Sequence, residues 1–414
     1  MKAVGLVLAL CVASVAPSPH AHYVEQLKES LGERFSDNIN EDARLDVPQL
    51  VRKYGYPLEE HSVTTEDGYI LTMHRIPHGR EANNVPDPRK PVVLVIHGLL
   101  CSSADFVLMG PGSGLGYILA EEGFDVWLGN VRGNYYSRRH VRLNPDSVLN
   151  PSFWNFSFDE IGNIDLPTMI DYVLAHTNNQ RLHYIGHSQG TTAFFIMGSL
   201  RPDYNKKIIS MQAMAPVAYM AHNRNPLLNV LAPHSKEISQ LETMLGLSEV
   251  LPHTEMMVWA GYALCKDGAI FQPLCSNILF LINVYDSQTM LPVILGHSPA
   301  GSSVFQLVHY AQSIADKGFR RFDHGALTNI RLYGRTNPPA YDLSKVTAPV
   351  FLHYSDNDAL AEVPDVMRLF RELGAPMGAF RVPLASFNHI DHMWGVDART
   401  LVYNKIINFM RSTK

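Results

Sequence analysis

The residues best placed for chemistry in this 414-residue chain lie in the pentapeptide Gly186–Gly190, which reads GHSQG. It follows the apolar run Leu182–Ile185 and precedes Thr191–Gly198, which can form a helix. In such a strand–turn–helix setting a nucleophilic serine sits in a strained turn, and flanking glycines let the strand and the helix approach each other. We therefore predict that Ser188 is the nucleophile of an acyl-transfer reaction. The alternative is an ordinary serine in a turn.

A serine nucleophile needs hydrogen-bond donors for the oxyanion that forms when it attacks a carbonyl group. One donor in this type of site is the backbone N–H of the residue after the serine, here Gln189. The other comes from the loop after an earlier strand, and the apolar run Val92–Ile96 leads into such a loop at His97–Leu100. We predict the Leu99 N–H as the second donor. The alternative is that this loop simply ends a strand.

The serine also needs a base and an acid that orients the base, and they follow in the order Ser, Asp, His. Two late polar clusters supply candidates at the ends of apolar runs, where an α/β sheet gathers its chemistry. Asp358 and His389 are 31 positions apart, which leaves room for one helix and one strand. Asp356 and His392 are their rivals, and residue type and spacing alone do not choose between them.

Short apolar runs that alternate with helical stretches must position these groups. The hairpin expected over Glu60–Pro77 turns at Asp67-Gly68, and Leu166–His176 is typical of the helices that follow. Strand–helix alternation predicts right-handed crossovers and a mainly parallel sheet. The expected strands are Val92–Ile96, Phe124–Leu128, Leu182–Ile185, Lys207–Ala213, Pro349–Tyr354 and Phe380–Pro383.

The alternation breaks between about Val217 and Asp342, a stretch rich in Leu, Met, Pro and aromatic residues. We interpret it as a mostly helical cap inserted over the carboxyl edge of the sheet. A separate downstream domain is the alternative, but strand-like sequence resumes at Pro349. The expected organisation is a signal peptide with flanking residues at 1–21, the core at 22–216 and 343–414, and the cap at 217–342.

The N-terminus and the cysteines indicate a secretory route. Met1–Ala16 has one early lysine and then about 13 uncharged apolar residues, which is typical of a signal peptide and too short to span a bilayer. Cleavage is expected between residues 14 and 21; a buried N-terminal helix is the alternative.

Of the four cysteines, Cys265 and Cys275 are close enough in sequence for a local bridge, and Cys101 is then left as a free thiol. Asn155-Phe156-Ser157 is a glycosylation sequon whose use the sequence leaves open.

Composition excludes several classes of protein. Apolar residues make up 46% and charged residues 18%, which is ordinary for a packed globular chain and excludes a disordered one. A formal net charge of −5 without a basic run argues against a nucleic-acid partner. Apart from the N-terminus no segment competes as a membrane span. There is no dinucleotide, P-loop or zinc-helix motif, so we expect no organic cofactor and no metal.

The chain resembles the acid lipase family of animals, which includes gastric and lysosomal acid lipases. The resemblance covers nearly the whole chain after the signal peptide. The segments that carry it are Val63–Tyr69, His74–Pro77, His97–Leu100, Asp125–Asn130, Arg132–Asn134, Phe156–Glu160, Gly186–Gly190, Pro299–Ser303 and Asn388-His389 with Asp391.

The resemblance implies an α/β-hydrolase fold with a cap and a lid. It makes Ser188 the nucleophile, Asp358 the acid and His389 the base, with the backbone amides of Leu99 and Gln189 as oxyanion donors. It also implies that Cys265 and Cys275 form a disulfide in the cap. Two departures from the family pattern stand out: Ser355-Asp356 replaces a common Gly-Gly pair before the acid, and Cys101 follows the oxyanion loop.

The expected activity is hydrolysis of carboxylic esters of neutral lipids at a lipid–water interface. Triacylglycerol is the first candidate substrate, and steryl and retinyl esters are further ones. A Met-rich apolar cap suits varied acyl chains, although the same residues could be the core of the cap. The alternatives are a soluble carboxylesterase that acts on small esters and a catalytically silent lipid-binding protein; a complete set of catalytic groups argues against the latter.

The protein is expected to be secreted, either outside the cell or into a gut lumen, or to reach the lysosome. The sequence does not indicate its oligomeric state.

Overall fold

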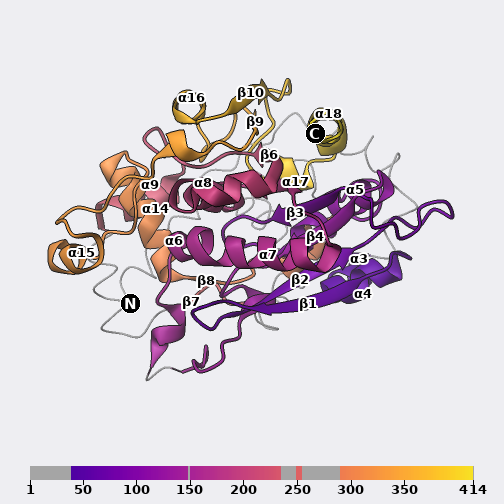
Figure 1. Cartoon of the computed structure of the whole chain (residues 1–414), viewed down its shortest axis with the longest axis horizontal. Helices are drawn as coiled ribbons and strands as arrows, with labels where there is room; N and C mark the ends of the chain where they lie inside the picture. The colour runs from indigo at the N-terminus through magenta and orange to yellow at the C-terminus, as the bar shows by residue number, and fades with distance from the viewer. Residues whose placement is uncertain (1–38, 148–149, 235–248, 254–289, 414) are drawn as a thin grey trace, which may run out of the picture.

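A computed structural model describes residues 39–147, 150–234, 249–253 and 290–413 (Figure 1). A sheet of eight strands lies at its centre, in the order β1-β2-β4-β3-β5-β6-β9-β10. The strands β1 and β2 form an antiparallel hairpin, β2 is antiparallel to β4, and all other neighbours are parallel. The eight strands are β1 (Glu59–Thr64), β2 (Ile70–Ile76), β3 (Val92–Ile96), β4 (Asp125–Gly129), β5 (Leu182–His187), β6 (Ile208–Met214), β9 (Val350–Tyr354) and β10 (Pro376–Arg381).

Helices cover both faces of the sheet, as Figure 1 shows. The α-helices are α3 (Ile39–Asp42), α4 (Val47–Lys53), α5 (Leu115–Glu121), α6 (Phe158–Glu160), α7 (Leu166–Thr177), α8 (Gln189–Leu200), α9 (Pro226–Leu231), α13 (Leu291–His297), α14 (Val304–Asp316), α15 (Ala326–Tyr333), α16 (Val363–Glu372), α17 (Asp391–Trp394) and α18 (Asn404–Ser412). Short 3₁₀ turns are η1 (Ser103–Phe106), η2 (Tyr135–Ser137), η3 (Pro151–Trp154), η5 (Pro202–Lys207), η6 (Ala232–His234) and η8 (Leu343–Lys345), and two π-helical turns are η4 (Ile161–Asp165) and η9 (Arg399–Tyr403).

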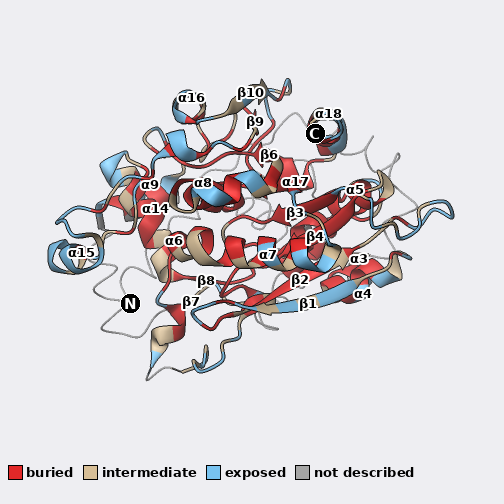
Figure 2. Ribbon diagram, viewed as in Figure 1, coloured by how far each residue is buried: buried red, intermediate tan, exposed pale blue. Residues whose placement is uncertain are grey.

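The core has two layers because side chains alternate across a strand. In β3, Leu94 and Ile96 pack in a cluster with helices α7 and α8, whereas Val93 and Val95 pack with α4, α5 and α18. All five residues of β3 are buried. Figure 2 shows the central strands as buried and the edge strand β1 as exposed. A strand that is apolar on both sides therefore belongs at the centre of a doubly covered sheet.

Most of the expected strands agree closely with the structure. The predicted hairpin and the first five apolar runs form β1 to β6 and β9, and the predicted helix Leu166–His176 is α7. The last strand was placed wrongly: β10 is Pro376–Arg381, and not Phe380–Pro383. It is an edge strand in which every residue is partly or fully exposed, and it has a proline at its first residue, where no ladder hydrogen bond is lost. Such a strand lacks the apolar run that marked the others.

The described parts of residues 217–342 contribute nothing to the eight-stranded sheet. They form the helices α9, α13, α14 and α15 and a two-stranded ribbon of β7 (Glu249–Val250) and β8 (Ser302–Ser303). This is the mostly helical character that the sequence predicts, although the bounds of the cap stay a prediction. The signal peptide, Cys265 and Cys275 lie outside the described residues. Within those residues, none of the helices has the length and apolar character that crossing a membrane requires.

Candidate active site

The serine of the GHSQG pentapeptide sits in a strained turn between β5 and α8. Ser188 has φ 50° and ψ −116°, a conformation that non-glycine residues rarely adopt. A Cβ atom on Gly186 would lie 2.8 Å from the carbonyl carbon of Gly190, and a Cβ on Gly190 would lie 2.3 Å from the carbonyl oxygen of Ile96. Only glycine fits at both positions, so these two residues let the turn pack this closely against its neighbours.

Beyond the ends of β9 and β10, a carboxylate and an imidazole form a buried pair. His389 Nδ1 lies 2.8 Å from Asp358 Oδ2, and Asp358 Oδ1 accepts hydrogen bonds of 2.8 Å from the backbone N–H groups of Leu360 and Ala361. Burial would raise the pKa of Asp358, but the charge and hydrogen bond of His389 and the two backbone donors lower it to about 2. Asp358 is therefore an ionised acceptor. His389 carries its proton on Nδ1 and leaves the lone pair of Nε2 available.

The two rival residues lie outside this pair. Asp356 is exposed and forms an ion pair with Arg381 of β10. His392 is fully buried, neither of its ring nitrogens has a hydrogen-bond partner among the described residues, and burial lowers its pKa to about 3. Neither residue takes part in the carboxylate–imidazole pair, which joins Asp358 to His389.

The serine turn is tied directly to the histidine loop. His187 precedes Ser188, and its Nε2–H donates to the carbonyl oxygen of His389 at 2.9 Å. The rings of His187 and His389 are 5.0 Å apart between centroids. A Cβ on Gly98 would lie 3.2 Å from the Cβ of Ser188, so the loop after β3 also reaches the serine. The ends of four strands thus meet at one edge of the sheet.

His97 fixes the orientation of the peptide between Gly98 and Leu99. Its Nε2 accepts hydrogen bonds from the side-chain amide of Asn134 at 3.0 Å and the backbone N–H of Val131 at 3.3 Å, so the proton is on Nδ1. Nδ1–H then donates to the carbonyl oxygen of Gly98 at 2.8 Å. In a trans peptide the C=O and N–H groups point in opposite directions. The Leu99 N–H therefore points away from the His97 ring. Burial lowers the pKa of His97 to about 4, partly offset by this hydrogen bond, so the ring is neutral near pH 7.

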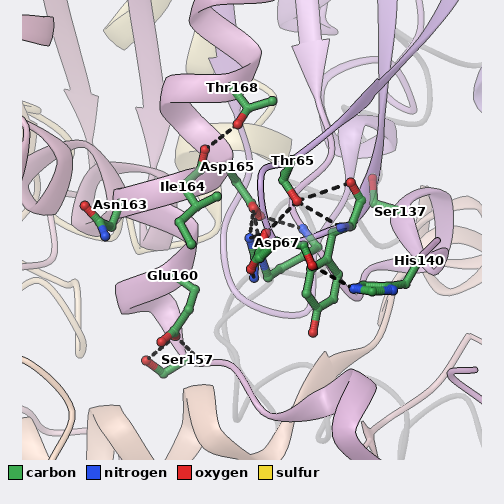
Figure 3. Close-up of polar contacts among 12 residues, drawn as sticks. Thr65, Asp67, Ser137, His140, Ser157, Glu160, Asn163, Ile164, Asp165 and Thr168 are labelled. Carbon is green, nitrogen blue, oxygen red and sulfur yellow. Dashed lines mark hydrogen bonds and ion pairs between the residues drawn. The ribbon is translucent and has the colours of Figure 1, made fainter. Parts of the chain in front are cut away.

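A buried ion-pair network anchors the loop that supports His97. Arg132 is 1% exposed; its Nε donates to Asp165 Oδ1 at 2.7 Å, and its Nη1 to Asp67 Oδ2 at 2.6 Å. Burial would lower the pKa of Arg132, but the charges and hydrogen bonds of Asp165 and Asp67 raise it. The guanidinium also lies 4.1 Å from the centroid of the Tyr69 ring. Figure 3 shows Asp67 and Asp165 converging here, close to Thr65.

Sequence reasoning missed the positions of His97, His187 and Arg132 in this framework. Histidine occurs 19 times in the chain, so its type carries no signal, and Arg132 was noted only as part of a resembling segment. One clue was present for the two histidines: His97 directly follows a predicted strand, and His187 directly precedes the serine.

One group of described residues has the donor atoms of a metal site. Ligand atoms of Glu59, His61 and His176 all lie within 4.8 Å of one another. However, Arg75 Nη1 lies 2.8 Å from Glu59 Oε2 and 3.4 Å from His176 Nε2. The guanidinium already occupies the place of a cation, so these residues do not fit a metal ion.

A strained serine between a parallel strand and a helix, with a buried Asp–His pair beside it, defines an α/β-hydrolase. Two family descriptions match: a partial alpha/beta-hydrolase lipase region over residues 47–110 and the alpha/beta hydrolase fold over residues 91–234. A solved structure of DcsB with a substrate analogue has a TM-score of 0.51 at 11% identity, covers 86% of this chain and all of its own, and shows the fold alone.

Three curated relatives specify the family. Lipase 1 of Drosophila melanogaster is 43% identical over 90% of this chain and 81% of its own length. Gastric triacylglycerol lipase of Rattus norvegicus is 39% identical over 90% of this chain and 93% of its own. Human lysosomal acid lipase/cholesteryl ester hydrolase is 37% identical over 90% and 92%, respectively. The chain belongs to the acid lipase family of the gastric and lysosomal lipases.

Proposed function

We propose that this chain hydrolyses carboxylic esters of neutral lipids through an acyl-serine intermediate, with Ser188, His389 and Asp358 as its catalytic triad. The observation that carries the proposal is the buried His389–Asp358 pair, whose loop is bonded to the serine turn through His187. Family membership supports the same reaction class.

Each group has a role that its surroundings suit. His389 Nε2 takes the proton of Ser188 Oγ while the oxygen attacks the ester carbonyl, and Asp358 stabilises the imidazolium that forms. The backbone N–H groups of Leu99 and Gln189 receive the oxyanion. His389 then gives the proton to the leaving alcohol. In the second half-reaction His389 takes a proton from a water molecule that attacks the acyl-serine, and it gives this proton to Ser188 Oγ as the fatty acid leaves.

Neutral lipids are the proposed substrates because of the relatives' names. A gastric triacylglycerol lipase and a lysosomal cholesteryl ester hydrolase are both similar to this chain over about nine-tenths of its length. Triacylglycerol is therefore the first substrate to test and cholesteryl ester the second.

We also propose that the protein follows the secretory route and is secreted or lysosomal, and that Cys265 and Cys275 form a disulfide in the cap. Mass spectrometry of a non-reduced digest tests the disulfide; a bridge to the buried thiol of Cys101 would contradict it.

The decisive experiment varies the concentration of one triacylglycerol through its solubility limit. A lipase with a cap over its site is expected to become sharply more active when the substrate forms an interface. Hydrolysis is measured by released fatty acid, with Ser188→Ala as the inactive control. A simple hyperbolic curve through the solubility limit would favour a soluble carboxylesterase. Absence of release from either short-chain or long-chain triacylglycerol would contradict the proposed function.

A further inference from the structure

The sequon Asn155-Phe156-Ser157 lies on the rim of a pocket. It is the only sequon in the 414 residues, because Asn150-Pro151-Ser152 has a proline at the position that forbids glycosylation. Asn155 ends the turn η3 and is exposed, whereas Trp154 and Phe156 on either side of it are each 2% exposed. The polar acceptor side chain is thus presented to solvent between two buried aromatic residues.

The pocket has a volume of about 350 Å³ and combines a polar rim with an aromatic wall. Asn155 and Glu160 contribute the polar side, and the aromatic wall consists of Phe305, Phe322 and His324. The rings of Phe305 and Phe322 meet edge to face at 5.4 Å, and those of Phe322 and His324 lie 4.7 Å apart. The volume is at the lower end of the roughly 300–1,000 Å³ of small-molecule pockets, which suits one sugar ring with its acetamide group.

We propose that Asn155 carries an N-linked glycan and that its first N-acetylglucosamine occupies this pocket. The inference rests on the proposed secretory route. In the transfer step, Asn155 Nδ2 forms a bond to C1 of the sugar while the bond from C1 to the pyrophosphate of the lipid-linked donor breaks. The pyrophosphate leaves with the electron pair, and the amide gives up one proton to the transferase. The apolar face of the sugar then lies on the aromatic wall, and its acetamide N–H is within reach of Glu160.

The folded chain dictates when the transfer must occur. Ser157 Oγ lies 3.1 Å from both the Asp159 N–H and His309 Nδ1, and Ser303 Oγ donates to the carbonyl oxygen of Phe156 at 2.5 Å. Figure 3 shows Ser157 also bonded to Glu160. A sequon held in this way cannot enter a transferase site, so the glycan must be added before folding. Folding then closes the pocket around the first sugar.

The glycan would connect two parts of the molecule. Asn155 follows η3, in the part of the chain that the sequence assigns to the core, whereas Phe305 belongs to α14, in the proposed cap. A sugar between them buries apolar surface on both. Removal of the glycan is therefore expected to weaken the attachment of α14, and not merely to expose a bare asparagine.

The test uses protein secreted from animal cells in which glycan processing stops at the high-mannose stage. Two glycosidases are compared on this protein. Endoglycosidase H cuts after the first sugar, whereas the amidase PNGase F must reach the bond at Asn155 itself. On native protein we expect Endoglycosidase H to act readily and PNGase F to act at least about tenfold more slowly than on denatured protein, because access requires local opening. Phe305→Ala should remove most of that protection, whereas Leu327→Ala, on the exposed helix α15, should leave it intact. Ser157→Thr keeps the sequon and should keep the glycan.

Each outcome has a distinct meaning. A secreted protein whose Asn155 peptide has the mass of unmodified asparagine would overturn this inference and leave the lipase proposal standing. Equal PNGase F rates on native and denatured protein would show that the sugar lies in solvent, which also overturns it. Retention inside cells without processing of the N-terminus would remove the secretory route and this inference together, while hydrolysis by cell extracts would still support the proposed function.

Discussion

Two buried carboxylates of this molecule, Asp358 and Asp165, have partners of different chemical character. Asp358 faces the imidazole of His389, a group that can both accept and donate a proton. Asp165 faces the guanidinium of Arg132, whose charge is permanent. Both pairs lie in a low-dielectric interior where an unpaired charge is expensive. The first arrangement can cycle protons during a reaction, whereas the second can only hold chain segments in place. Burial of an ion pair alone therefore does not identify a catalytic site; one partner must also be able to accept and donate a proton.

The strongest way to break the first pair is Asp358→Asn. Loss of the carboxylate that fixes the tautomer of the base should lower kcat by about 10⁴-fold while the protein stays folded. Asp356→Asn is the matched control, because that exposed residue pairs with Arg381, and it should retain most of the activity. Initial rates on emulsified triacylglycerol measure both. The reverse result would show that the acid has been assigned wrongly.

Disruption of the second pair, Arg132–Asp165, should lower the stability of the fold more than the rate of hydrolysis. Arg132→Met leaves Asp165 buried without its partner and should lower the free energy of unfolding by about 3–5 kcal/mol. Arg411→Met removes a half-exposed ion pair with Glu122 and should cost under about 1 kcal/mol. Urea unfolding followed by fluorescence gives both values. If the two substitutions cost the same, the Arg132 network does not anchor its loop.

His97 links the two regions, because its ring touches both the anchored loop and the Gly98–Leu99 peptide. His97→Asn can still donate to the Gly98 carbonyl from the position of Nδ1, whereas His97→Gln can reach only the position of Nε2. We expect His97→Gln to lower kcat by about 10²–10³-fold, the usual cost of one lost oxyanion donor, with KM little changed. His97→Asn should retain clearly more activity. Equal losses in the two variants would contradict the orientation mechanism.

The smallest expected effect is on the pH dependence of stability. The pKa of Asp358 is about 2 in the folded chain, below its ordinary value of 3.8. A lowered pKa stabilises the folded state above about pH 4, and the contribution is lost as the pH falls through about 2. It amounts to about 2 kcal/mol at most. Urea midpoints measured between pH 5 and pH 2 should converge for the wild-type protein and Asp358→Asn. Parallel curves would show that Asp358 is not held ionised by its neighbours.

Local sequence predicted those parts of the site whose geometry is itself local. The glycines at 186 and 190 leave room for a tight turn around Ser188, and β3 is apolar on both faces because it is central. The proposed acid was different: Asp356 and Asp358 are two positions apart, and only the turn after β9 sends one toward Arg381 and the other toward His389. That choice depends on neighbours distant in sequence. The role of Arg132, whose partners lie 33 and 65 residues away, was hidden for the same reason.

The hydrogen bond from His187 to the carbonyl of His389 joins residues 202 positions apart. Contacts of such long sequence separation form late, because most of the chain must be ordered before their ends can meet. The serine turn, by contrast, has partners closer in sequence, such as Ile96 beside Gly190 and the Met214 carbonyl that accepts from the Ser188 N–H, and can form earlier. A refolding chain should therefore regain its helices and its tryptophan environment before it regains turnover. Recovery of activity thus reports completion of the last step in assembly, and a nascent chain that lacks its final strand also lacks His389, the proposed base.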